Sequence, residues 1–142
     1  MEELYFTDRT YGVEDLPEGR LAKGEYDGCT FLQLDLSGAD LTGCTFMDCR
    51  LEACNLGNAK MKGAALKSVA FVDCKLTGIH FRDCITFLFA VSFERCKLDL
   101  SSFHKMPMKE TRFLDCSLQE ADLSEADLSR ACLLYTSPSP RD

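Results

Sequence analysis

A large apolar residue returns every five positions along most of this chain, and no ordinary element of secondary structure has that period. A strand repeats its faces about every 2 residues and a helix about every 3.6, so a period of five indicates a repeat array. A small or apolar residue stands two places before each large one. The uninterrupted series is Tyr26, Phe31, Leu36, Leu41, Phe46, Leu51, Leu56, Met61, Leu66, Phe71, Leu76 and Phe81.

Each five-residue unit can be built as a short extended piece followed by a corner. The small and the large residue are two apart, so both face inward, while the residue between them faces outward and is mostly polar. The second residue after the large one would need φ > 0 in a type II turn, which suits glycine best. Four units would close a square coil of about 20 residues, and successive coils would stack about 4.8 Å apart. That corner position holds Gly28, Gly38, Gly43, Gly63 and Gly78, and elsewhere Asp48, Asn58, Asp73 and Asp83.

The repeated motif resembles that of the pentapeptide-repeat family, A(D/N)LXX. It stands as Ala39-Asp-Leu41-Thr-Gly, Ala121-Asp-Leu123-Ser-Glu and Ala126-Asp-Leu128-Ser-Arg, with cysteine variants such as Cys54-Asn-Leu56-Gly-Asn. The resemblance covers residues 24–131. It implies an all-β protein, a right-handed quadrilateral β-helix, for which the length of the repeat predicts about five coils.

Residues 1–23 follow the repeat less cleanly and contain a turn signal, Leu16-Pro-Glu-Gly19. The open end of a β-helix exposes unpaired backbone and core, so something must cover it. We expect this segment to be an N-terminal cap with one strand or, equally, an irregular first coil.

The register of the repeat slips by two residues near residues 82–92. Thr86 stands where a large residue is due, and the pattern resumes with Leu88 and Phe93 inward. A two-residue bulge at a corner would place Phe87 outward and Phe89 at the corner. Their rings either fold over the bulge as local packing or form an exposed patch for a partner. Phe87 and Phe89 are therefore the candidate partner-binding residues.

Residues 132–142 differ from everything before them and resemble the translation of a sequencing-library adapter read through in frame. We expect this tail to be non-native, to join no coil, and to replace a C-terminal segment of a longer protein. Family resemblance implies that the missing segment would hold the C-terminal cap and an element for homodimer formation.

Eight of the nine cysteines occupy the small inward position of a unit. No C-x-x-C pair is present and only two histidines, His80 and His104, occur, so the pattern does not indicate a zinc site. Stacked inward cysteines would stand wider apart than a disulfide prefers. We therefore expect buried free thiols, which fit a reducing compartment and a cytoplasmic protein.

No catalytic pair, phosphate loop or cofactor motif can be assembled, and no apolar run is long enough for a membrane helix. The charge is −7 overall but uneven, with −7 in residues 1–40, +3 in residues 41–110 and −3 in residues 111–131. This distribution does not predict direct nucleic-acid binding, since no dense basic patch is present. We expect neither enzymatic activity nor a catalytic, cofactor or metal site.

Two functions remain open. The first is a protein-interaction scaffold that uses the aromatic bulge at Phe87 and Phe89. The second follows from resemblance to the quinolone-resistance members of the family, which implies a DNA mimic that binds DNA gyrase or topoisomerase IV, both type II topoisomerases. Overall acidity favours the mimic, whereas the positive middle segment and the short bulge favour the scaffold.

Overall fold

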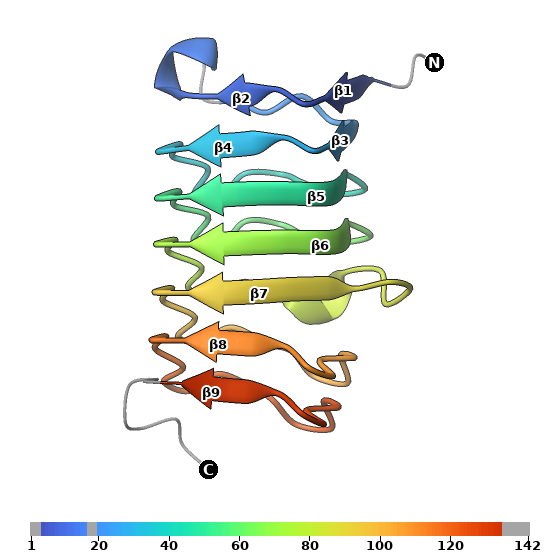
Figure 1. Cartoon of the computed structure of the whole chain (residues 1–142), viewed down its shortest axis with the longest axis vertical. Helices are drawn as coiled ribbons and strands as arrows, with labels where there is room; N and C mark the ends of the chain where they lie inside the picture. The colour runs from blue at the N-terminus through green and yellow to red at the C-terminus, as the bar shows by residue number, and fades with distance from the viewer. Residues whose placement is uncertain (1–3, 17–19, 135–142) are drawn as a thin grey trace.

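The computed structural model describes residues 4–16 and 20–134, which form one stack of β-coils (Figure 1). The strands on the near side lie one beneath another along the long axis, and the chain descends between them as a right-handed coil. The all-β, right-handed quadrilateral β-helix is confirmed. The stack has about six turns instead of about five, because the N-terminal segment adds a turn of its own.

Nine strands pair in parallel, mostly with an offset of 20 residues, as in Tyr26 with Phe46 and Phe46 with Leu66. The strands are β1 (Tyr5–Thr7), β2 (Thr10–Tyr11), β3 (Glu25–Asp27), β4 (Thr30–Leu32), β5 (Thr45–Glu52), β6 (Ala65–Val72), β7 (Ala90–Glu94), β8 (Arg112–Leu114) and β9 (Cys132–Leu134). Two 3₁₀ turns, η1 (Val13–Asp15) and η2 (Phe81–Asp83), complete the elements.

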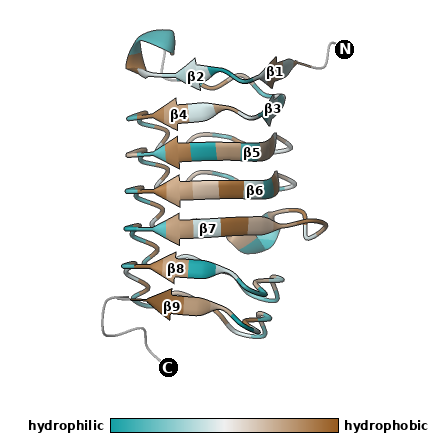
Figure 2. Ribbon diagram, in the orientation of Figure 1, coloured by the Kyte–Doolittle hydropathy of each residue, from teal (hydrophilic) through white to brown (hydrophobic). Residues whose placement is uncertain are grey.

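Each coil has four walls, named here by the outward residue at the middle of each wall. Wall 1 carries Glu25, Thr45 and Ala65, and wall 2 carries Thr30, Arg50, Ala70, Ser92 and Arg112. Wall 3 carries Asp35, Asn55, Lys75, Lys97 and Ser117, and wall 4 carries Asp40, Lys60, His80, Ser102 and Asp122. The long strands β5 and β6 cover walls 1 and 2, and Figure 2 shows bands of apolar and polar residues along β5.

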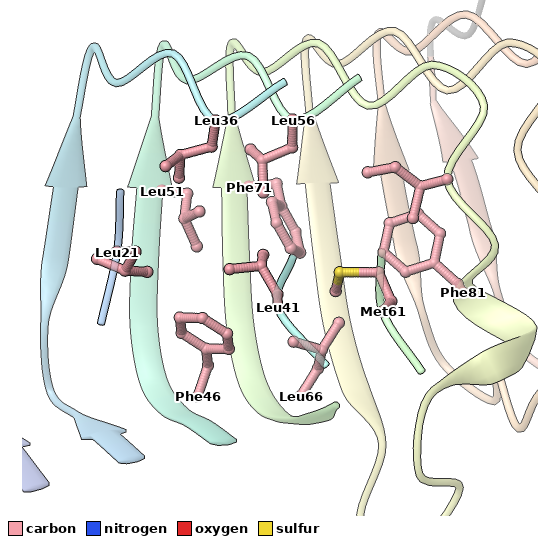
Figure 3. A pocket seen from close by; sticks show the side chains of 11 residues that line it. Leu21, Leu36, Leu41, Phe46, Leu51, Leu56, Met61, Leu66, Phe71 and Phe81 are labelled. Carbon is pink, nitrogen blue, oxygen red and sulfur yellow. The ribbon is translucent and has the colours of Figure 1, made fainter. Parts of the chain in front are cut away.

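The large residues fill the inside of the square, as predicted. Only about 10 Å³ of free space remains among the apolar side chains that surround the axis from Leu21 to Phe81 (Figure 3). That space is at the lower limit for a single water molecule, so this part of the interior offers no ligand cavity. Aromatic rings stack from coil to coil in four columns, Phe6–Tyr26–Phe46, Tyr11–Phe31, Phe71–Phe93–Phe113 and Phe81–Phe103.

The corner positions have the predicted positive φ, with one exception. All five predicted glycines and Asp48, Asn58 and Asp73 have φ between 52° and 72°. Asp83 does not, because it ends the 3₁₀ turn η2, so the corner prediction is wrong there.

The predicted separation of the C-terminal tail is also wrong in part. Cys132–Leu134 forms β9 and pairs with β8, with Phe113 opposite Leu133, so these three residues continue the repeat register. Residues 135–142, which make up most of the predicted non-native tail, lie outside the described residues.

Candidate interaction surface

The segment from Phe81 to Phe89 is where the regular coil is interrupted. η2 replaces the expected corner, and the chain then rejoins the coil above through Ile85, whose N–H donates to the Ala64 carbonyl at 2.8 Å. A further turn follows, closed by the Phe89 N–H on the Thr86 carbonyl at 3.1 Å. Figure 1 shows this segment projecting beside the start of β7.

The structure places Phe89 inward and Leu88 outward, the reverse of the predicted register. Phe89 is only 7% exposed and belongs to the core, whereas Leu88 is 60% exposed with φ at +58°. The reason is a bulge in the pairing of β6 with β7. Lys67 stands opposite Ala90, an offset of 23, but Val69 stands opposite Val91, an offset of 22. The inward place beneath Leu66 therefore falls to Phe89.

Of the two candidate partner-binding residues, only Phe87 is available to a partner. Its side chain is 69% exposed, and Ile85 and Leu88 beside it are 43% and 60% exposed. Sequence reasoning missed Ile85 and misplaced Leu88, although the apolar run from Ile85 to Phe89 was the signal that could have found both. Ile85, Phe87 and Leu88 are called the loop tip below.

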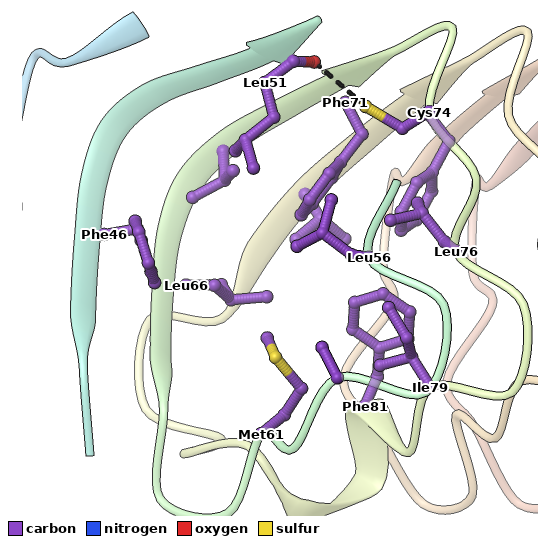
Figure 4. Close-up of a cluster of buried hydrophobic side chains, with 14 of the residues drawn as sticks. Phe46, Leu51, Leu56, Met61, Leu66, Phe71, Cys74, Leu76, Ile79 and Phe81 are labelled. Atoms are coloured by element: carbon purple, nitrogen blue, oxygen red, sulfur yellow. Dashed lines mark hydrogen bonds between the residues drawn. The ribbon is translucent and has the colours of Figure 1, made fainter. Parts of the chain in front are cut away.

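The inward cysteines pack in the core, and most of them hydrogen-bond to backbone carbonyls. Cys54, Cys74, Cys96 and Cys116 stack along wall 3, each in the small inward position. The Cys74 thiol donates to the Leu51 carbonyl of the coil above at 3.3 Å, as Figure 4 shows, and lies 3.4 Å from the Val72 carbonyl. The eight predicted inward cysteines are all buried and free.

Burial also makes the thiols of Cys49 and Cys84 unreactive. It raises the pKa of Cys49 to about 11 and the pKa of Cys84 to about 12. The thiolate is the nucleophilic and metal-binding form, so both groups remain protonated and inert near neutral pH. Within residues 4–16 and 20–134, no three His, Cys, Asp or Glu side chains lie together as a metal site would require.

Aspartate carboxylates in units such as Ala126-Asp-Leu128-Ser accept hydrogen bonds from the serine two residues later and so stabilise the corners. Asp127 accepts hydrogen bonds from the Ser129 hydroxyl at 2.6 Å and from the Ser129 N–H at 3.0 Å, and these bonds lower the pKa of Asp127. Asp35 and Asp122 have the same two bonds, from Ser37 and Ser124, and a lowered pKa. These aspartates are therefore turn elements.

The two histidines lie apart on the surface. His80 is on wall 4, with its Nδ1 4.0 Å from an oxygen of Asp83, whereas His104 Nδ1 is 2.7 Å from the Ser124 hydroxyl. The side-chain contacts of the two rings are to Asp83 for His80 and to Ser124 and Glu125 for His104. Among the described residues, none of the helical turns is long and apolar enough to span a membrane.

Comparison with known proteins agrees with the repeat and the fold. Family models match twice, "Pentapeptide repeat region" over residues 24–89 and "Pentapeptide repeats (8 copies)" over residues 96–133. Curated protein sequences yield no match.

Solved structures with a similar fold share little sequence with this chain. A trypsin-treated variant of QnrB1, a plasmid-mediated fluoroquinolone resistance protein, is 20% identical at a TM-score of 0.42, over 94% of this chain and 72% of that one. Full-length QnrB1 is 19% identical at 0.40, over 89% and 71%. HetL, involved in heterocyst differentiation regulation in the cyanobacterium Nostoc, is 14% identical at 0.32, over 92% and 85%. With its repeat matched over residues 24–89 and 96–133, this chain belongs to the pentapeptide-repeat family.

Proposed function

We propose that this protein is a non-enzymatic scaffold that binds a protein partner through the loop tip. The observation that carries the proposal is the exposure of Ile85, Phe87 and Leu88 together on one short segment, whereas Met47 and Leu100, the other exposed large apolar residues between β3 and β8, stand singly. Exposed apolar groups of this kind are typical of protein-contact sites, in which aromatic anchors supply most of the binding energy.

The rest of the molecule supports a scaffold. The interior is packed and the inward cysteines are buried, which leaves the walls and their corners as the surface available to a partner. The backbone of the loop tip is held at both ends, by the Ile85 bond to Ala64 and by the Thr86–Phe89 turn. A segment held in this way loses little conformational entropy on binding, which favours affinity. Buried free thiols also suit the cytoplasm, where we place the protein.

A photo-crosslinking amino acid in place of Phe87 tests the proposal in cells. We expect a specific crosslinked protein at position 87, and weaker binding of that purified partner to a Phe87→Ser variant, by roughly 2 kcal/mol or more. Leu100 provides the matched control, since it is also exposed at a corner with φ at +62° but lies outside the loop tip. Equal crosslinking at positions 87 and 100 would contradict the proposal.

A second candidate is the DNA mimic that binds DNA gyrase or topoisomerase IV and protects against quinolones. Exposed carboxylates favour it at the corner between walls 1 and 2 of the first coils, where Asp8 and Asp48 lie on either side of Gly28. Lys60 and Lys62 on wall 4 are the wrong charge for a mimic of DNA. A gyrase supercoiling assay with and without a quinolone decides, because absence of both binding and protection would exclude the mimic and leave the scaffold.

A further inference from the structure

The backbone ladder of wall 4 is open between two coils. Above the opening it is regular, with the Lys60 N–H on the Ala39 carbonyl at 2.8 Å and the Leu41 N–H on the Lys60 carbonyl at 2.9 Å. Below it, the Ser102 N–H donates to the Ile79 carbonyl at 2.9 Å. Between Lys60 and His80 the structure has no β-bridge.

The opening is bounded at both corners and has a clear cause. The coils are joined on one side by the Asn58 N–H on the Thr77 carbonyl, and on the other by the Gly63 N–H on the Asp83 carbonyl, both at 2.9 Å. η2 begins directly after His80 and turns the chain away from its wall position. The insertion that creates the loop tip therefore also parts wall 4.

Two backbone donors are left over at the opening. In a regular coil the Met61 N–H would donate to the His80 carbonyl, and the His80 N–H to the Ala59 carbonyl. Across residues 4–16 and 20–134 neither N–H has a hydrogen-bond partner. The His80 carbonyl instead accepts from the Asp83 N–H at 3.1 Å. Unpaired backbone donors are uncommon in folded proteins and call for a partner.

Two lysine side chains line the hollow at this opening. The opening is part of a hollow of about 430 Å³, whose lining includes Lys60, Lys62, His80 and Asp83. Neither lysine forms an ion pair with any residue that the structure describes. Asp83 is the one carboxylate in the lining, and its nearest ionic partner is His80 at 4.0 Å.

We propose that this opening in wall 4 binds a phosphate group. The opening offers two backbone N–H donors and two lysine ammonium groups. A single carboxylate has only two oxygens to accept from them, whereas a phosphate has three strong acceptor oxygens and a larger negative charge, so phosphate fits this set of donors better. The phosphate can be free, part of a small ester, or carried on a side chain of a partner. The site does not depend on the proposed role of the loop tip, since it faces wall 4 and uses none of the tip side chains.

Titration with inorganic phosphate, followed residue by residue by ¹H–¹⁵N NMR, tests the site directly. Against sodium chloride at equal ionic strength, we expect saturable shifts of the Met61 and His80 amide signals, with a dissociation constant on the order of 1 mM. A K60Q/K62Q variant should bind at least about tenfold more weakly. Asp83→Asn should bind more tightly, because it removes the one repelling charge.

The matched control is a K75Q/K97Q variant, which loses the same charge on wall 3, where the ladder is closed between these two residues. It should bind phosphate as the unmodified protein does. Shifts that sodium chloride reproduces, equal weakening by both double variants, or no shift at Met61 and His80 would each overturn the proposal. A phosphoserine peptide that displaces phosphate identifies a modified partner as the source, and failure to displace it identifies a free phosphate or a small ester.

Discussion

The coils before and after the insertion have the same period but different corners between walls 1 and 2. Before it, β5 and β6 run through this corner as strands of eight residues, and the Cys49 thiol donates to the Tyr26 carbonyl of the coil above at 3.2 Å. After it, the Thr111 N–H closes the corner on the Met108 carbonyl at 3.1 Å, and β8 has only three residues. One repeat can therefore satisfy its corner carbonyls in two ways, with a thiol or with its own backbone.

The strongest test of this comparison places the same substitution in a regular coil and in the insertion. Leu56→Lys should unfold the protein, because Leu56 is 1% exposed and an unpaired charge would be buried among the walls. Leu88→Lys should leave the fold intact, since Leu88 is 60% exposed. Circular dichroism and thermal unfolding measure both, and a folded Leu56→Lys protein with an unchanged β spectrum would refute the inward assignment.

A corner glycine should matter through its backbone conformation alone. Gly43 has φ at +72°, and the space that a Cβ would occupy there is open, so Gly43→Val adds strain without a clash. We expect a loss of about 1–2 kcal/mol in the free energy of unfolding, and a smaller effect of Thr42→Val beside it. Denaturant unfolding of the two variants gives the comparison. Equal losses would show that the corner does not require the left-handed conformation.

The thiol hydrogen bonds should contribute less to the free energy of unfolding than the corner glycine does. A serine hydroxyl should be able to replace a thiol as the donor. Cys74→Ala removes the donor to the Leu51 carbonyl and should cost about 1 kcal/mol. Cys74→Ser should restore most of that loss, because Ser101 already donates to the Leu76 carbonyl in this way at 2.7 Å. Cys44→Ala controls for the lost sulfur volume, since the Cys44 thiol is buried but donates to no carbonyl among the described residues. A Cys74→Ala loss no larger than that of Cys44→Ala would show that the thiol bond does not stabilise the corner.

The smallest effect concerns the carboxylates of the last coils. The pKa of Asp127 is lowered in the folded state, so its contribution to stability is full above its unfolded pKa of about 4 and is lost as the pH falls below it. Ser129→Ala removes one donor and should lower the unfolding midpoint slightly near neutral pH, but not in acid. Thermal unfolding across this pH range measures the difference, and a deficit that persists unchanged in acid would contradict the sign.

The sequence predicts the regular part of this molecule because every unit repeats one steric rule. The inward place of Leu56 and the positive φ of Gly43 follow from counting by five. Counting fails between Phe81 and Phe89, where two consecutive turns and a bulge opposite Lys67 exchange the places of Leu88 and Phe89. Neither turn has a sequence signal of its own, and a slip of one residue reverses every side chain.

The opening in wall 4 was beyond sequence reasoning for a related reason. Lys60 and His80 occupy regular outward positions, and nothing in their identity shows that the ladder between them is missing. The opening comes from η2, which starts one residue after His80, and a backbone hydrogen bond that is absent leaves no trace in a residue pattern.

Native-state amide hydrogen exchange, measured residue by residue, tests most directly the claim that the insertion opens the backbone ladder of wall 4 between Lys60 and His80. The Met61 and His80 amides should exchange rapidly, whereas the Leu41 and Ser102 amides, which are bonded across the same wall, should be protected by several orders of magnitude. Protection of Met61 equal to that of Leu41 would show that wall 4 is closed, and would contradict the claim.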